Sequence, residues 1–327
     1  MPSSGVTRSR RGALPARTGL SIRPRLVTAA YRYGSVLARA LPRPVALALA
    51  EIGGRIAVRA MPERAFLVAR NLERIAAGPL EAGQRRRQVR RVFASYARYW
   101  VESFRLPRLG DAELDQGHDV TGYEHVAAAM EGGRGMILVL AHLGGWEWSA
   151  YWLARITRLR ITAVVEPLQP PELMAWFRDF RQSLGMTVVA LGPTAGHEVL
   201  AALRRNEVVC LVADRDLSGG GVQVDFLGEQ TTLPAGPAML ALRAGVPLCP
   251  AAVYFHGRYG HRTIVRPPLE LTRTGGLRAD VARLTQVIAD ELGALVQAAP
   301  EQWHVMQPNW PSDLEALERY RSGLGPA

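Results

Sequence analysis

Short apolar segments alternate with helical patterns over residues 111–327, and this alternation restricts the possible fold more than any other feature. The clearest apolar runs are GMILVLA at 135–141 and VVCLVA at 208–213, each typical of a strand buried on both faces. The predicted strands are 135–141, 160–165, 186–191, 208–213, 247–256 and 262–265, and the predicted helices are 146–156, 171–184, 196–204, 234–244 and 278–298. Strands joined through helices form largely parallel sheets. We therefore predict an α/β fold with a mixed, largely parallel central sheet flanked by helices.

The first third of the chain is helical, amphipathic and basic. Residues 1–110 hold 22 arginines and 5 acidic residues, whereas residues 111–327 hold 18 arginines and 24 acidic residues. This asymmetry predicts a polyanionic partner for the basic helices, either nucleic acid or the anionic inner leaflet of a membrane. The arginines alternate with apolar helix faces, and no recognised nucleic-acid-binding motif occurs. We therefore expect an anionic membrane surface as the partner and no nucleic acid.

The domain organisation follows from these changes in composition. The expected segments are a disordered basic tail (1–24), an amphipathic helical membrane-associating region (25–110), an α/β core forming one domain with it (111–313), and a C-terminal tail (314–327). No apolar stretch approaches the length of about 18 residues that a transmembrane helix needs. The N-terminus lacks the apolar core and cleavage site of a signal peptide. We expect a peripheral or monotopic protein at the cytoplasmic face of the plasma membrane.

The sequence HLGGWE, which begins at His142, stands where a predicted strand ends and a helix begins. Open α/β sheets bind ligands at the carboxyl ends of strands, so His142 is expected to face that crevice. Gly144 and Gly145 permit a tight turn, and the helix that starts at Trp146 offers free N–H groups to negative charge. Glu147 is placed to fold back toward the imidazole. An imidazole oriented by a carboxylate can take a proton from a hydroxyl.

A second polar group follows the strand VVCLVA. Asp214, Arg215 and Asp216 come directly after it and lead into a glycine-rich loop. This segment is either a charged loop with an internal ion pair or a loop in which Arg215 positions an anionic head group. A further turn, ending at Gly236, begins the next predicted helix.

Other residues are weaker candidates. Arg178, Arg181 and Arg215 are candidates for binding the phosphate groups of a substrate. A groove for an apolar ligand or the core accounts equally well for the aromatic residues Trp146, Trp148, Trp152, Trp176 and Phe177. The seven histidines are scattered, and no HExxH, GxGxxG or GxxxxGK[ST] motif occurs. We expect no metal and no permanently bound cofactor.

Several ordered segments resemble the bacterial lysophospholipid-acyltransferase-like superfamily. They are the strand ending in His-x4-acid and the DRD segment, followed by GVQVDFLGEQTTLPAGPAMLALRAGVPLCPAAVY. The branch is that of lipid A late acyltransferases and phosphatidylinositol mannoside acyltransferases. VVEPLQPPELMAWFRDFRQSLGM (164–186) and PEQWHVMQPNW (300–310) resemble the mannoside members in particular. The resemblance covers residues 25–313.

The resemblance implies transfer of a fatty acyl group, expected to be palmitoyl, from the cosubstrate acyl-CoA to a mannose hydroxyl of a phosphatidylinositol mannoside. His142 matches the family's general base, and Glu147 matches the acid of the same motif. Gln223 stands where the family pattern has an acid, so Glu147, Asp214 and Asp216 all remain open as the carboxylate that orients the imidazole. We expect catalytic roles for His142, Glu147 and Asp216, and substrate binding by Gly144, Gly145, Trp146, Arg181, Asp214, Arg215 and Gly236.

Two alternatives share this chemistry. An acyl-CoA thioesterase of the same fold would release the fatty acid to water. An acyltransferase for another glycolipid or a lysophospholipid would keep the reaction and change the acceptor. Sequence alone does not separate these activities.

Overall fold

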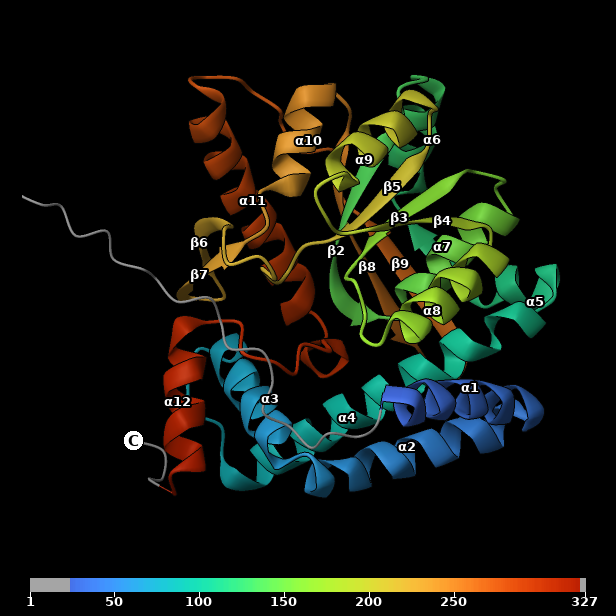
Figure 1. Cartoon of the computed structure of the whole chain (residues 1–327), viewed down its shortest axis with the longest axis vertical. Coiled ribbons are helices and arrows are strands. Elements are labelled where there is room, and N and C mark those ends of the chain that lie inside the picture. Colours follow the sequence, from blue (N-terminus) through green and yellow to red (C-terminus); the bar gives the residue numbers. More distant parts are fainter. Residues whose placement is uncertain (1–23, 324–327) are drawn as a thin grey trace, which may run out of the picture.

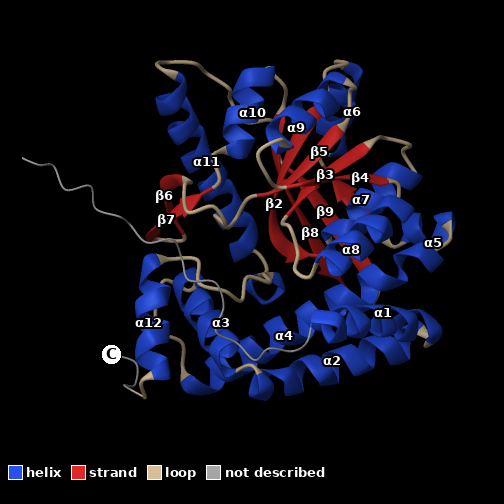
Figure 2. Cartoon of the chain, in the orientation of Figure 1, coloured by secondary structure: helices blue, strands red, loops and turns tan. Residues whose placement is uncertain are grey.

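The computed structural model describes residues 24–323 and confirms the predicted α/β fold class (Figure 1, Figure 2). Its main sheet has seven strands in the order β1-β9-β8-β2-β5-β3-β4. Five strands, from β8 to β4, are parallel, whereas β9 is antiparallel to β8 and β1 is parallel to β9. The strands are β1 (His118–Thr121), β2 (Met136–Gly144), β3 (Ile161–Val165), β4 (Met186–Ala190), β5 (Val208–Val212), β8 (Leu248–His256) and β9 (Gly260–Val265).

Strand β2 lies at the centre of this sheet, between β5 and β8. Every side chain from Met136 to Ala141 is buried, which explains why the strand is an unbroken apolar run. Ile137 and Val139 face a core that includes α9, α10 and α11, whereas Leu138 and Leu140 face α6 and α7. The helices around the sheet are α5 (Asp111–Gln116), α6 (Tyr123–Glu131), α7 (Trp146–Arg155), α8 (Pro171–Ser183), α9 (Ala195–Arg204), α10 (Gly236–Ala244) and α11 (Leu277–Gln297).

Four N-terminal helices lie along one edge of the α/β core, at the bottom of Figure 1. They are α1 (Pro24–Ala40), α2 (Arg43–Ala60), α3 (Pro62–Ile75) and α4 (Ala82–Arg105). Helix α4 contacts the other three and continues through the short 3-10 helix η1 (Leu106–Arg108) into the core. Its Arg105 donates hydrogen bonds to the carbonyls of Ala38 and Leu41, which fixes the α1–α2 connection on α4. None of the helices in residues 24–323 has the length and apolar character needed to cross a membrane.

Some segments differ from expectation. The loop expected after Asp216 contains an antiparallel hairpin of β6 (Val222–Phe226) and β7 (Glu229–Leu233). Most of the expected C-terminal tail forms α12 (Pro311–Arg321), which follows the 3-10 helix η2 (Pro300–Gln302). Ion pairs from Arg70 and Arg74 to the buried Asp313 hold α12 on α3. The expected disordered tail, apart from its last residue, lies outside the described residues.

Candidate active site

His142 lies near the carboxyl end of β2, and its side chain is partly exposed, as expected for a residue facing the crevice of an open sheet. The turn into α7 depends on Gly144, which has a φ of +57°. A Cβ atom at Gly144 would lie 1.8 Å from the carbonyl oxygen of Val253 on β8, so a larger residue does not fit. Gly145 is restricted less severely, because its Cβ would lie 2.9 Å from Nε2 of the buried His261 side chain. Gly144 is therefore needed for the backbone path itself, and Gly145 for the space beside His261.

Asp214 is the carboxylate that contacts the imidazole. Its Oδ1 lies 2.6 Å from Nδ1 of His142, and its Oδ2 accepts a hydrogen bond of 2.9 Å from the His142 backbone N–H. The contact forms because β2 and β5 are neighbours in the sheet, so their carboxyl ends meet. Asp214 thus binds His142, and its contact with substrate stays a prediction.

The environment of Asp214 keeps the carboxylate ionised. Complete burial would raise the pKa of Asp214, but the adjacent imidazole and hydrogen bonds from His142 and Trp303 lower the pKa below its ordinary value. Trp303 Nε1 donates to Oδ2 at 2.7 Å. An ionised Asp214 favours a proton on Nδ1 of His142, which leaves the lone pair on Nε2. Within residues 24–323, Nε2 has no hydrogen-bond partner, so this nitrogen is available to a substrate proton.

The segment after η2, residues 303–309, packs against the His142–Asp214 pair. The His304 N–H donates a hydrogen bond of 2.8 Å to the carbonyl of His142, and Leu143 forms a bridge with Trp303. Asn309 Nδ2 donates to the carbonyl of Asp214 at 3.0 Å. Reasoning from residue patterns missed these roles. The only signal was that these residues fall within the PEQWHVMQPNW block that carries the family resemblance.

Glu147 does not reach the imidazole, which corrects the expectation that it folds back to His142. Its Oε1 accepts hydrogen bonds from Tyr99 of α4 at 2.7 Å and from Arg181 of α8 at 3.0 Å. Both charged side chains are buried, and the Arg181 guanidinium lies over the ring of Trp146. Burial, followed by the nearby Glu147 charge, raises the pKa of Tyr99 well above its ordinary value. Arg181, predicted to bind substrate, is thus engaged in fixing the first turn of α7.

Asp216, expected to be catalytic, organises its own loop. It accepts hydrogen bonds from the backbone N–H and hydroxyl of Ser218, from the Gly221 N–H at 2.8 Å and from Thr232 at 3.0 Å. Burial alone would raise the pKa of Asp216, but these hydrogen bonds lower it. The structure therefore gives Asp216 no contact with the imidazole.

Arg215 and Gly236 are two further predicted substrate-binding residues. Arg215 donates a hydrogen bond of 2.8 Å to Gln307 and forms an ion pair of 3.1 Å with Glu166, so its charge is already partnered. Gly236 is the partly buried first residue of α10. Within residues 24–323, no hydrogen bond or ion pair joins the Arg215 side chain or Gly236 to the His142–Asp214 pair.

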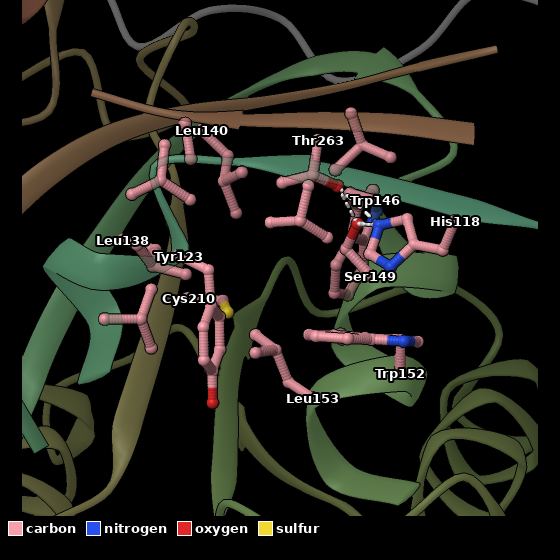
Figure 3. A pocket seen from close by; sticks show the side chains of 16 residues that line it. His118, Tyr123, Leu138, Leu140, Trp146, Ser149, Trp152, Leu153, Cys210 and Thr263 are labelled. Carbon is pink, nitrogen blue, oxygen red and sulfur yellow. Dashed lines mark hydrogen bonds between the residues drawn. The ribbon is translucent and has the colours of Figure 1, made fainter. Parts of the chain in front are cut away.

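An apolar cavity lies between α6, α7 and the sheet (Figure 3). Leu138 and Leu140, which precede His142 on β2, line the cavity together with Trp146 and Leu153 of α7. Its volume is about 30 Å³ in this conformation. The cavity therefore lies against one face of the strand that carries His142. At this volume it has room for little more than solvent unless side chains move.

The polar end of this cavity is formed by His118, Ser149 and Thr263. His118 Nε2 lies 2.8 Å from the Ser149 hydroxyl and 2.7 Å from the Thr263 hydroxyl, and the two hydroxyls also bond each other (Figure 3). Burial lowers the pKa of His118 to about 3, so the imidazole is neutral at pH 7. The two hydroxyls and Nε2 of His118 are thus partnered with one another, whereas the buried Nδ1 of His118 has no hydrogen-bond partner within the described residues.

The predicted groove aromatics divide into three sets. Trp146 and Trp152 line the cavity. Trp148 stacks on the buried His261 with ring centroids 4.1 Å apart, and it belongs to the core. Trp176 and Phe177 pack in an aromatic cluster with helices α1 and α4.

Comparison with known proteins identifies the family. The chain is 40% identical over 298 residues to the phosphatidylinositol mannoside acyltransferase of Mycolicibacterium smegmatis, covering 90% of this chain and 94% of that protein. It is 42% identical over 230 residues to the protein of the same name from Mycobacterium tuberculosis, covering 69% and 71% of the two chains. Residues 20–312 match the sequence profile described as bacterial lipid A biosynthesis acyltransferase. The chain is therefore an acyltransferase that belongs to the bacterial lipid A biosynthesis acyltransferase family.

Proposed function

We propose that this enzyme transfers a fatty acyl group from acyl-CoA to a mannose hydroxyl of a phosphatidylinositol mannoside, with His142 as general base. The observation that carries the proposal is the His142–Asp214 pair, whose Nε2 is open at the end of a central strand. The acceptor class follows from the names of the relatives, which are 40% and 42% identical to this chain. The geometry of the site thus supports the proposed chemistry, and the names of the relatives support the proposed acceptor class.

In the proposed reaction His142 takes up one proton and later returns it. Nε2 of His142 takes the proton from the mannose hydroxyl as its oxygen attacks the thioester carbonyl. The tetrahedral intermediate then expels the coenzyme A thiolate, which receives the same proton from the imidazolium. Asp214 stabilises the imidazolium between these two transfers and holds the ring in place.

The first turn of α7 is suited to the negative charge that develops on the carbonyl oxygen. The backbone N–H groups of Trp146 and Glu147 have no acceptor within the helix, because the first N–H groups of any helix lack one. These groups lie just beyond the glycines that follow His142. The buried pair of Glu147 and Arg181 keeps this turn in place, so its contribution is positioning.

We assign the acyl chain to the apolar cavity beneath β2. The cavity is lined by apolar side chains over most of its wall, as an alkyl chain requires. A volume of about 30 Å³ is too small for such a chain, so side chains that line the cavity must move when it enters. Removal of water from the reacting thioester favours transfer to a sugar over hydrolysis.

The outer faces of α1 and α2 suit a membrane surface. Tyr33 is 76% exposed, and Leu37 and Ile52 are more than half exposed. Val45, Leu49, Ile52 and Ile56 follow one another at helical spacing on α2, with exposed arginines nearby. Apolar side chains beside cations favour the interface of an anionic bilayer, where the acceptor glycolipid is anchored. We therefore propose a peripheral or monotopic enzyme on the cytoplasmic face of the plasma membrane.

The test of the activity is transfer of labelled palmitate from palmitoyl-CoA. The acceptors are phosphatidylinositol mono- and dimannoside, phosphatidylinositol and lysophosphatidic acid, and a further reaction contains no acceptor. Product on the mannosides alone supports the proposal. Product on another lipid would retain the chemistry and change the acceptor, and free palmitate in every reaction would indicate a thioesterase.

A further inference from the structure

A groove between α3, α4 and α12 lies apart from the His142 site. Its volume is about 520 Å³, which falls within the range of about 300–1,000 Å³ that small-molecule sites occupy. Phe66 and Ala69 of α3 and Val89 of α4 contribute apolar surface to it. Phe66 stacks on Tyr320 of α12 with ring centroids 4.7 Å apart, so the helices that form the walls are packed together. The groove is thus a formed feature of the fold.

The groove carries an excess of positive charge. Five arginines and one glutamate line it. Two of these arginines are partnered: Arg70 pairs with Asp313 at 2.9 Å, and Arg85 pairs with Glu73 at 3.6 Å. The remaining three, Arg86, Arg90 and Arg319, have no hydrogen-bond or ion-pair partner within the described part of the chain. These three guanidinium groups therefore favour an anion beside the groove.

The position of the groove indicates where its ligand comes from. Val58, near the end of α2, contributes to the groove, and the exposed Ile56 and Met61 lie close to it in the chain. The end of α2, the helix whose exposed apolar side chains suit a membrane surface, therefore contributes to the groove, and Figure 1 shows α2 leading into α3 with α12 beside α3. A molecule that suits both surfaces has an apolar chain and an anionic head.

We propose that this groove binds one anionic phospholipid of the bilayer. Its phosphate lies among Arg86, Arg90 and Arg319, and one acyl chain lies along Phe66 and Val89. The proposal rests on the proposed residence at a membrane surface, and it is separate from the acyl-transfer chemistry. A lipid held at this point adds one specific contact to the apolar and cationic surface of α1 and α2, and so fixes the orientation of the enzyme on the leaflet.

The test measures binding of monomeric lipid to the full-length protein by isothermal titration calorimetry, without acyl-CoA or acceptor. The probes are dihexanoyl-phosphatidylglycerol below its micelle-forming concentration, dihexanoyl-phosphatidylcholine and inorganic phosphate. The variant Arg86→Gln/Arg90→Gln removes two charges from the groove. Its matched control is Arg87→Gln/Arg91→Gln, with the same helix, spacing and charge change, because Arg87 and Arg91 are exposed and do not line the groove.

We expect the anionic lipid to bind the wild type, and the groove variant to bind it about tenfold more weakly or worse, while the control variant binds normally. A second variant, Ala65→Phe, narrows the apolar part and leaves every charge in place, and it should also weaken binding. Melting curves verify that each variant is folded.

Several outcomes would overturn the proposal. Equal losses in the groove and control variants would indicate unspecific attraction to charge. If phosphatidylcholine binds as tightly as phosphatidylglycerol, the groove does not recognise the anionic head. If inorganic phosphate binds as tightly as phosphatidylglycerol, the groove does not recognise the lipid. Displacement of the lipid by phosphatidylinositol mannoside, with a raised acceptor KM in the groove variant, would make the groove an acceptor subsite. Because binding is measured without substrates, failure of the proposed acyl transfer would leave this result interpretable.

Discussion

The edge of the sheet that carries His142 and the outer face of α1–α2 are organised in opposite ways. At the His142 edge, Asp214 is 72 residues from His142 in the chain, and Trp303 is 89 residues from Asp214. On the outer face of α1–α2, the apolar residues follow one another within single helices and have solvent as their neighbour. The site therefore depends on the packing of distant segments, whereas the face depends on helical periodicity alone. Substitutions at the His142 edge should therefore change turnover, and substitutions on the outer face of α1–α2 should change membrane binding.

The largest expected effect is that of His142→Ala on turnover. We expect kcat to fall by about 10²–10⁴-fold, since the proposed general base is lost. Adsorption to vesicles should stay at the wild-type level, because the apolar face is untouched. His197→Ala, at an exposed histidine on α9, is the control and should retain activity. Near-normal turnover by folded His142→Ala protein would remove His142 from the mechanism.

Asp214→Asn should reduce kcat by about 10²-fold or more, because a neutral amide cannot stabilise the imidazolium or fix its tautomer. Asp216→Asn is the comparison, since Asp216 is also a carboxylate at this edge but accepts its hydrogen bonds from Ser218, Gly221 and Thr232. Its effect on kcat should be clearly smaller. The reverse order would return the orienting role to Asp216.

Glu147→Gln should lower the free energy of unfolding by about 3 kcal/mol, because it leaves the buried Arg181 charge without its partner. The double variant Glu147→Gln/Arg181→Met should recover part of that loss, as measured by urea denaturation. If the losses in the free energy of unfolding of the two single variants, Glu147→Gln and Arg181→Met, add up to that of the double variant, the two side chains do not stabilise the fold together.

A smaller effect is expected for the outer face. Leu37→Ser/Ile52→Ser should weaken partition into anionic vesicles by about tenfold, since two exposed apolar side chains are lost. Turnover on a water-soluble acceptor should not change. Leu277→Ser/Leu314→Ser, at exposed leucines on α11 and α12, is the matched control and should partition normally.

The smallest effect concerns pH. Burial lowers the pKa of His304 in the folded protein to about 3, below its unfolded value of about 6.5. The unfolded chain therefore binds the proton more tightly, so wild-type stability should fall as pH falls from about 6.5 toward 3. At pH 5.5 the contribution of His304 to this loss is about 1 kcal/mol. His304→Gln should show a shallower pH dependence in urea denaturation, and an unchanged dependence would place the effect elsewhere.

Much of the architecture was predictable from local patterns. The apolar runs at β2 and β5 were unbroken because their strands are buried on both faces, and the proline-rich break at residues 41–44 separated α1 from α2. The β6–β7 hairpin was missed because it is short and interrupted by polar residues. Helix α12 was missed because ion pairs of Asp313 with Arg70 and Arg74 hold it to α3, and a scan for periodicity does not detect such pairs.

The sequence by itself determined the strand–helix alternation, the exposed position of His142 at a strand end and the apolar period of α1 and α2. Each depends on neighbours within a few residues along the chain. Only the tertiary structure decided among Glu147, Asp214 and Asp216 as the partner of His142. Three carboxylates were available, and the order of strands placed β5 beside β2, which brought Asp214 to Nδ1. Glu147 turned instead toward Arg181, because a buried carboxylate is stabilised by the nearest cation that the packing provides.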